Sequence, residues 1–159
     1  MRDIQKLGHP IALHFDTHFY NIQSEKELLK YLTFEKAILE KVFEQKIEVF
    51  SFHNTTPFIL SCQKWKYAGL INTYSEFFQK QVGYCSDTNG YWRERRLEDV
   101  LTQATDRSVQ VLIHPEWWQE TIMSPKQRIN RCIDDRAVAN KKWYEQALKK
   151  FGRDNLDWE

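Results

Sequence analysis

This sequence of 159 residues lacks the features that mark several specialised classes of protein. Its 23 lysines and arginines nearly balance 22 aspartates and glutamates, and the net charge of +1 predicts neither a nucleic-acid partner nor a membrane-surface partner. No apolar run approaches the roughly 20 residues that a membrane span needs. Residues 1–9 hold no apolar stretch of the signal-peptide kind, and the chain has no internal repeats or low-complexity segments.

Cysteine is also scarce, since only Cys62, Cys85 and Cys132 are present. The number is odd and no Cys-x-x-Cys pair occurs, which argues against a disulfide framework and against a thiolate zinc site. Reduced, mostly buried cysteines in a cytoplasmic protein are the interpretation that fits best.

The chain contains enough apolar residues to form a packed core. Hydrophobic residues make up 42% and aromatic residues 14%, with six tryptophans. At this length, and without a shift in composition along the chain, we predict a single domain over residues 1–159. Core filling explains the aromatic residues most simply, and stacking of some of them on sugar rings is the alternative.

The pattern of apolar residues predicts strands that alternate with helices. Ser24 and Ser124 have the character of helix N-caps, with Glu27 and Gln127 three residues later, and Gly152 is placed to end the last helix. The alternation predicts an α/β fold with a parallel sheet and helical crossovers. The expected helices are 1–7, 24–45, 75–80, 97–104 and 124–150; the expected strands are 11–14, 47–53, 70–71, 82–86 and 109–113, with a loop at residue 57.

One charged residue falls on the apolar face of the helix at 24–45. At about 100° per residue, Glu35 lies within about 20° of Leu28, in the middle of that face. A buried carboxylate is costly unless it is hydrogen-bonded or paired with a cation. We therefore expect Glu35 to be partly buried and bonded at the helix rim or to a backbone N–H, with a role beside the strand end at residues 51–53 as the alternative.

Polar clusters follow four of the predicted strands, and they contain His14 with His18, then His53, Asp87 and His114. Because parallel strands share one carboxyl edge, we expect His14, His18 and His114 to face one cleft. The i,i+4 spacing of His14 and His18 suits a metal site if the segment is helical or tightly turned, and two surface or capping histidines are the alternative. Imidazole ligands favour zinc, iron, nickel or cobalt.

The last cluster combines a histidine with two tryptophans. His114 follows the clearest strand, and Trp117 and Trp118 come just after it. A histidine in this position could protonate a substrate that stacks on the indole rings. The alternative is a histidine bonded to a loop carbonyl, with both tryptophans packed in the core.

Four segments together resemble motifs of the polysaccharide deacetylase-like family, in the order that the family has them. They cover the chain from residue 8 to residue 118, and the match is to a divergent branch rather than to the chitin deacetylases. The four segments are GHPIALHFD at 8–16, SFHN at 51–54, SDTNGYW at 86–92 and VLIHPEWW at 111–118.

The resemblance implies a (β/α) barrel and a metal-dependent hydrolase that removes N-acetyl groups from a sugar or polysaccharide. On the family's pattern, His14 and His18 would bind a divalent metal, most simply zinc, while His114 would protonate the leaving amine and Asp87 would orient its ring. The residues that would contact the carbohydrate substrate are His53, Asn54, Trp92, Trp117 and Trp118.

The family's first strands, which carry its metal-binding and base aspartates, have no counterpart in this sequence. The chain therefore resembles a partial (β/α) barrel that lacks those strands. Asp16 stands between the two histidines, a place that disfavours it as a third ligand, so we expect weak metal binding. We also expect no turnover by this chain alone, and self-association through an exposed edge at the strand 11–14. A non-catalytic remnant that binds carbohydrate or protein is the alternative function.

Overall fold

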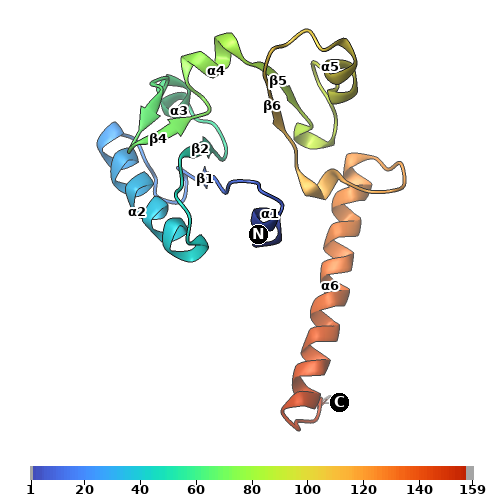
Figure 1. The fold of residues 1–159 in the computed structure, drawn as a ribbon. Coiled ribbons are helices and arrows are strands. Elements are labelled where there is room, and N and C mark those ends of the chain that lie inside the picture. The colour runs from blue at the N-terminus through green and yellow to red at the C-terminus, as the bar shows by residue number, and fades with distance from the viewer. Residues whose placement is uncertain (1, 157–159) are drawn as a thin grey trace. The chain divides into compact units, whose positions relative to one another are not determined.

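The computed structural model describes residues 2–156 and has a mixed α/β fold (Figure 1). The chain divides into two compact units, residues 1–83 (the N-terminal unit) and residues 84–159 (the C-terminal unit). The described strands form two small open sheets, and no closed barrel occurs among them. The predicted single domain and the predicted partial barrel both stay predictions.

The N-terminal unit is built on a four-stranded sheet. Its strands run in the order β1 (Leu13–Phe15), β2 (Val49–Phe52), β4 (Leu70–Asn72) and β3 (Lys66–Tyr67). The pairs β1–β2 and β2–β4 are parallel, and β3 runs antiparallel to β4. The helices of this unit are α1 (Arg2–Lys6), α2 (Glu25–Phe43), α3 (Pro57–Ser61) and α4 (Glu76–Gln81).

One face of this sheet is buried and the other carries polar residues. Leu13 and Phe15 of β1 are buried, whereas His14 between them is exposed, because successive side chains of a strand point to opposite faces. Phe50 and Phe52 of β2 are buried in the same way. Helix α2 packs its buried residues Leu28 and Leu32 into this core, together with Ile59 of α3.

Helix α2 begins where the sequence predicts. Ser24 is its N-cap, and the Ser24 hydroxyl accepts a hydrogen bond from the backbone N–H of Glu27. The helix ends at Phe43, two residues before the predicted end, because Glu44 adopts a left-handed backbone conformation with φ of 54°. Glu35 is half-buried as predicted, but its partner is the Tyr20 hydroxyl, which donates to the carboxylate at 2.8 Å.

The C-terminal unit is built around a two-stranded sheet of β5 (Gly83–Ser86) and β6 (Val109–Leu112). Its helices are α5 (Leu97–Gln103) and α6 (Pro125–Lys150), with single 3₁₀ turns η1 (Thr88–Gly90) and η2 (Pro115–Trp117) one and two residues after the ends of β5 and β6. The carboxyl ends of β5 and β6 lie together, since the backbone N–H of Asp87 donates to the Leu112 carbonyl at 3.2 Å.

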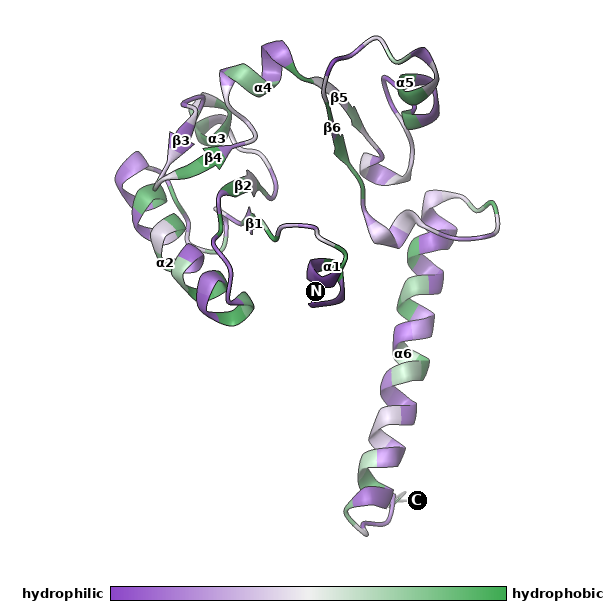
Figure 2. Cartoon of the chain, viewed as in Figure 1, coloured by the Kyte–Doolittle hydropathy of each residue, from purple (hydrophilic) through white to green (hydrophobic). Residues whose placement is uncertain are grey.

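Helix α6 has both of the ends that the sequence predicts. Ser124 and Gln127 form a reciprocal capping box at its start. At its end, Gly152 has φ of 62°, and the N–H groups of Gly152 and Arg153 donate to the Lys149 and Leu148 carbonyls, as in a Schellman motif. Hydrophobic and hydrophilic residues alternate along the helix (Figure 2), and within the described chain none of its residues is buried.

Some elements differ from the prediction. The segment at residue 57 is the helix α3 rather than a loop, because Thr56 caps it and accepts a hydrogen bond from the Ile59 N–H. The short strand β3 was not predicted, and the strands form two sheets instead of one. None of the helices in the described part of the chain is both long and apolar enough to cross a membrane.

Candidate functional site

The residues singled out from the sequence fall into two groups, one in each unit. The expectation that His14, His18 and His114 face one cleft rested on a single sheet with one carboxyl edge. In the structure β1 and β6 belong to different sheets in different units, so that expectation stays a prediction. The N-terminal group is His14, His18, His53 and Asn54, and the C-terminal group is Asp87, Trp92, His114, Trp117 and Trp118.

Asp87 and His114 form a hydrogen-bonded dyad in the C-terminal unit. Asp87 directly follows β5, His114 lies two residues after the end of β6, and the pairing of these strands brings the two together. Asp87 Oδ1 lies 2.7 Å from His114 Nδ1, and Asp87 Oδ2 accepts a hydrogen bond from the backbone N–H of His114 at 3.1 Å. The carboxylate of Asp87 thus holds both the ring and the main chain of His114.

The exposure of the two partners differs in a way that suits proton transfer. Asp87 is buried, at 6% exposed, whereas the His114 side chain is about a third exposed. Since the carboxylate accepts from Nδ1, the neutral ring carries its proton there, and Nε2 is left to accept or donate a proton. The predicted contact between these residues is therefore present, and their catalytic roles stay predictions.

A cavity of about 760 Å³ in the C-terminal unit adjoins the dyad through Asp87, which is one of its lining residues. This volume lies within the range of small-molecule sites. All three tryptophans predicted to contact substrate, Trp92, Trp117 and Trp118, line the same cavity. Flat indole faces next to a carboxylate are suited to a ring with both apolar faces and polar edges, such as a sugar.

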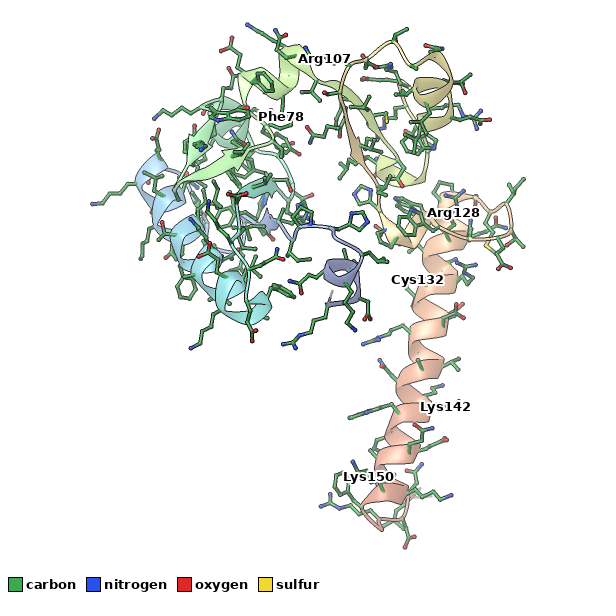
Figure 3. The ribbon with its side chains drawn as sticks, in the orientation of Figure 1. Phe78, Arg107, Arg128, Cys132, Lys142 and Lys150 are labelled. Carbon is green, nitrogen blue, oxygen red and sulfur yellow. The ribbon has the colours of Figure 1, made fainter. Side chains whose placement is uncertain are left out.

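The wall of the cavity is held together by Arg128, which the sequence analysis missed. This arginine lies near the start of α6 (labelled in Figure 3). Its Nη1 donates to the carbonyls of Gly90 and Trp117, each at 3.3 Å, and its Nε donates to the Met123 carbonyl at 3.0 Å. Arg128 thereby joins the η1 turn, the η2 turn and the loop before α6. A lone arginine in a helix gives no signal of such a role in the sequence.

Two further details define the aromatic wall. Gly90 has φ of +81°, and a Cβ at this position would lie 3.1 Å from Trp117 Cε3 and 3.1 Å from Pro125 Cγ, so a larger residue here strains the backbone and requires its neighbours to shift. The indole N–H of Trp117 is buried and has no hydrogen-bond partner among the described residues. Trp118 is 58% exposed, which leaves much of its ring open to a ligand.

In the N-terminal unit, His14 lies between Ser51 and His53. The parallel register places His14 of β1 opposite Ser51 of β2. His14 Nδ1 lies 2.8 Å from the Ser51 hydroxyl, and His14 Nε2 lies 3.1 Å from His53 Nδ1. The two imidazole rings meet edge to face, with centroids 5.1 Å apart. Asn54, the remaining predicted substrate contact of this unit, is exposed.

His18 is placed differently. It lies in the turn after β1, where Asp16 Oδ1 accepts a hydrogen bond from the His18 backbone N–H at 2.9 Å and lies 3.5 Å from His18 Nδ1. The pKa of Asp16 is lowered, chiefly by this backbone hydrogen bond and to a smaller degree by the charges of His53 and His18. His18 is thus associated with Asp16.

These contacts do not provide the three-ligand metal site that the family resemblance implies. Within residues 2–156, no three His, Cys, Asp or Glu side chains come together in a group that could hold a metal ion. The nitrogen that faces His14 Nε2 belongs to His53 and not to His18. A zinc site normally uses three or four protein ligands. We therefore derive no chemical step through a metal, and the weakly bound divalent metal stays a prediction.

Comparison with known proteins identifies no relative of this chain. No protein-family model, no curated protein and no solved structure matches the chain.

Proposed function

We propose that this chain acts on an N-acetylated sugar or polysaccharide as part of a metal-dependent deacetylase with a partial (β/α) barrel of the polysaccharide deacetylase type. The observation that carries the proposal is the dyad of His114 with buried Asp87 beside a tryptophan-lined cavity. The order of the four sequence motifs supports the same assignment. The proposal includes a cytoplasmic location and no nucleic-acid or membrane partner.

The positions of the side chains support the following proposed roles. The sugar ring stacks on the indoles of Trp117 and Trp118, which line the cavity. His114 has Nδ1 bonded to Asp87, which lines the cavity, and on this proposal its Nε2 gives a proton to the amine nitrogen as water replaces the amine at the acetyl carbon. Asp87 keeps the ring in the right tautomer, and its charge balances that of the imidazolium before the proton is given up.

A second function, binding of carbohydrate without catalysis, is favoured by a different observation. The tryptophan-lined cavity is present, whereas no group of three metal-ligating side chains occurs in the described chain. A binding protein needs the aromatic surface and does not need the dyad, so substitution of Asp87 separates the two functions.

The experiment is a titration of the full chain with an oligomer of N-acetylglucosamine, combined with an assay of acetate release in the presence of zinc. We expect binding that Trp117→Ala abolishes and that Trp65→Ala, an exposed aromatic residue of the N-terminal unit, leaves unchanged. Trp117→Phe keeps a smaller aromatic ring and removes an N–H that has no partner in the described structure, so it should retain more of the binding than Trp117→Ala.

The Asp87→Asn variant then decides between the two functions. Acetate release by the wild-type chain that falls about 10²–10⁴-fold in this variant, with binding retained, supports the deacetylase and contradicts the expectation that this chain alone has no turnover. Binding with no acetate release from any form supports the binding protein. The absence of any binding at millimolar sugar would overturn both.

A further inference from the structure

We propose that His14 and His53, rather than His14 and His18, form the metal-binding pair of the N-terminal unit, and that this pair takes a divalent transition-metal ion such as zinc. The pair is present in the structure with its two ring nitrogens facing each other at 3.1 Å. Metal binding by this pair does not depend on the proposed function, and only the role of the metal in a deacetylase rests on it.

The separation of the two nitrogens fits a shared ion. Zinc–nitrogen bonds of about 2.0–2.1 Å at a tetrahedral angle put two ligating nitrogens roughly 3.3 Å apart. His14 Nε2 and His53 Nδ1 lie within a few tenths of an ångström of that separation.

The hydrogen bonding of His14 is compatible with the tautomer that metal binding requires. Nε2 of His14 binds a metal only when it carries no proton, so the proton of the neutral ring must be on Nδ1. The Ser51 hydroxyl lies 2.8 Å from Nδ1 and can accept that proton's hydrogen bond. Groups that bond the far nitrogen of a ligating histidine in this way orient the ring and strengthen the metal site.

The backbone that carries both histidines is fixed by the core. His14 lies between the buried residues Leu13 and Phe15, and His53 directly follows buried Phe52. The backbone N–H of His53 donates to the Phe15 carbonyl at 2.8 Å, which extends the β1–β2 ladder up to His53 itself. Because both histidines are exposed, an ion can reach them from solvent.

On this proposal the i,i+4 spacing of His14 and His18 does not mark the metal-binding pair, and the backbone conformation gives the reason. Side chains four residues apart converge on one face in a helix, but His14 is part of an extended strand that ends at Phe15. His18 follows in a turn and is associated with Asp16. In a parallel pair of strands, the neighbours of His14 come from the adjacent strand, which here supplies Ser51 and His53.

The test is calorimetric titration of the full chain with zinc, comparing wild type with His14→Ala, His53→Ala and His18→Ala. We expect weak binding that loses about tenfold or more in affinity in the first two variants and changes less than about twofold in the third. His9→Ala is a further control, since His9 lies before β1 and outside the pair. Thermal unfolding without metal shows whether each variant is folded.

A second readout needs no variant. In wild type, zinc should shift the ring nitrogen resonances of His14 and His53, while those of His18 stay in place.

Loss of binding in His18→Ala with full binding in His53→Ala would overturn the inference, as would the absence of zinc binding at millimolar concentration. The sugar titration of Trp117 variants can be done without metal, so failure of this inference is distinguishable from failure of the proposed function.

Discussion

Replacement of Gly90 by alanine tests whether the wall of the tryptophan-lined cavity is packed as described. Gly90 ends the η1 turn that follows Asp87, and its backbone N–H donates to the Asp87 carbonyl at 2.8 Å. Its φ of +81° is a conformation that alanine adopts only with strain, and the added Cβ would lie 3.1 Å from both Trp117 and Pro125. The substitution therefore combines a backbone cost with a packing cost.

The two costs can be separated with a matched control in the same unit. Gly152, with φ of +62° and no atom within 4 Å of an added Cβ, carries only the backbone cost, about 1–2 kcal/mol. Gly90→Ala carries a similar backbone cost and a further ~1–3 kcal/mol for overpacking, since the added Cβ meets both the Trp117 ring and the Pro125 ring at 3.1 Å. We expect Gly90→Ala to lower the free energy of unfolding by about 1–3 kcal/mol more than Gly152→Ala.

Urea unfolding followed by tryptophan fluorescence measures this difference. In a Trp65→Phe background, every remaining tryptophan belongs to residues 84–159, so the signal reports the C-terminal unit. Equal losses of stability for the two alanine variants would refute the packing of Gly90 against Trp117 and Pro125, and with it the described wall of the cavity.

Two further predictions concern residues whose burial differs. Cys132 is exposed, whereas Cys62 and Cys85 are buried and burial raises the pKa of each thiol, so a thiol reagent should label Cys132 in the native chain and all three after unfolding. Burial also raises the pKa of Tyr20 and of Tyr67 from 10.0 to about 12, with the Glu35 carboxylate adding to the effect at Tyr20. The neutral phenols therefore stabilise the fold fully below pH 10, and this contribution is lost as the pH rises through about 12. A titration followed by phenolate absorbance should show two tyrosines that ionise later than the others, and Tyr67→Phe should remove one of these two.

The boundaries of the helices were largely predictable because their signals are local. A serine that caps the first turn with a partner three residues later marks the start of both α2 and α6, and the glycine after α6 marks its end. The start of α3 has the same kind of signal in Thr56 and Pro57, but the helix is only five residues long and has no apolar periodicity to reveal it. The early end of α2 depends on Glu44 taking a left-handed conformation, which no residue type at that position announces.

The partners within the candidate site were less predictable because they depend on strand pairing. The contact of Asp87 with His114 followed from a family resemblance and is present in the structure. The contact of His14 with His53 arises from the register of β1 against β2, two strands separated by the whole of α2. Local spacing drew attention instead to His18, which is near in sequence but is associated with Asp16.

The most direct test of the central claim is a nuclear magnetic resonance titration of the full chain with an oligomer of N-acetylglucosamine. If the sugar enters the cavity beside the dyad, the ring resonances of His114 and the indole resonances of Trp117 and Trp118 should shift together and saturate at one sugar concentration. The indole of Trp65 should not shift. Saturable binding that moves Trp65 and leaves His114 and the cavity tryptophans unchanged would contradict the account.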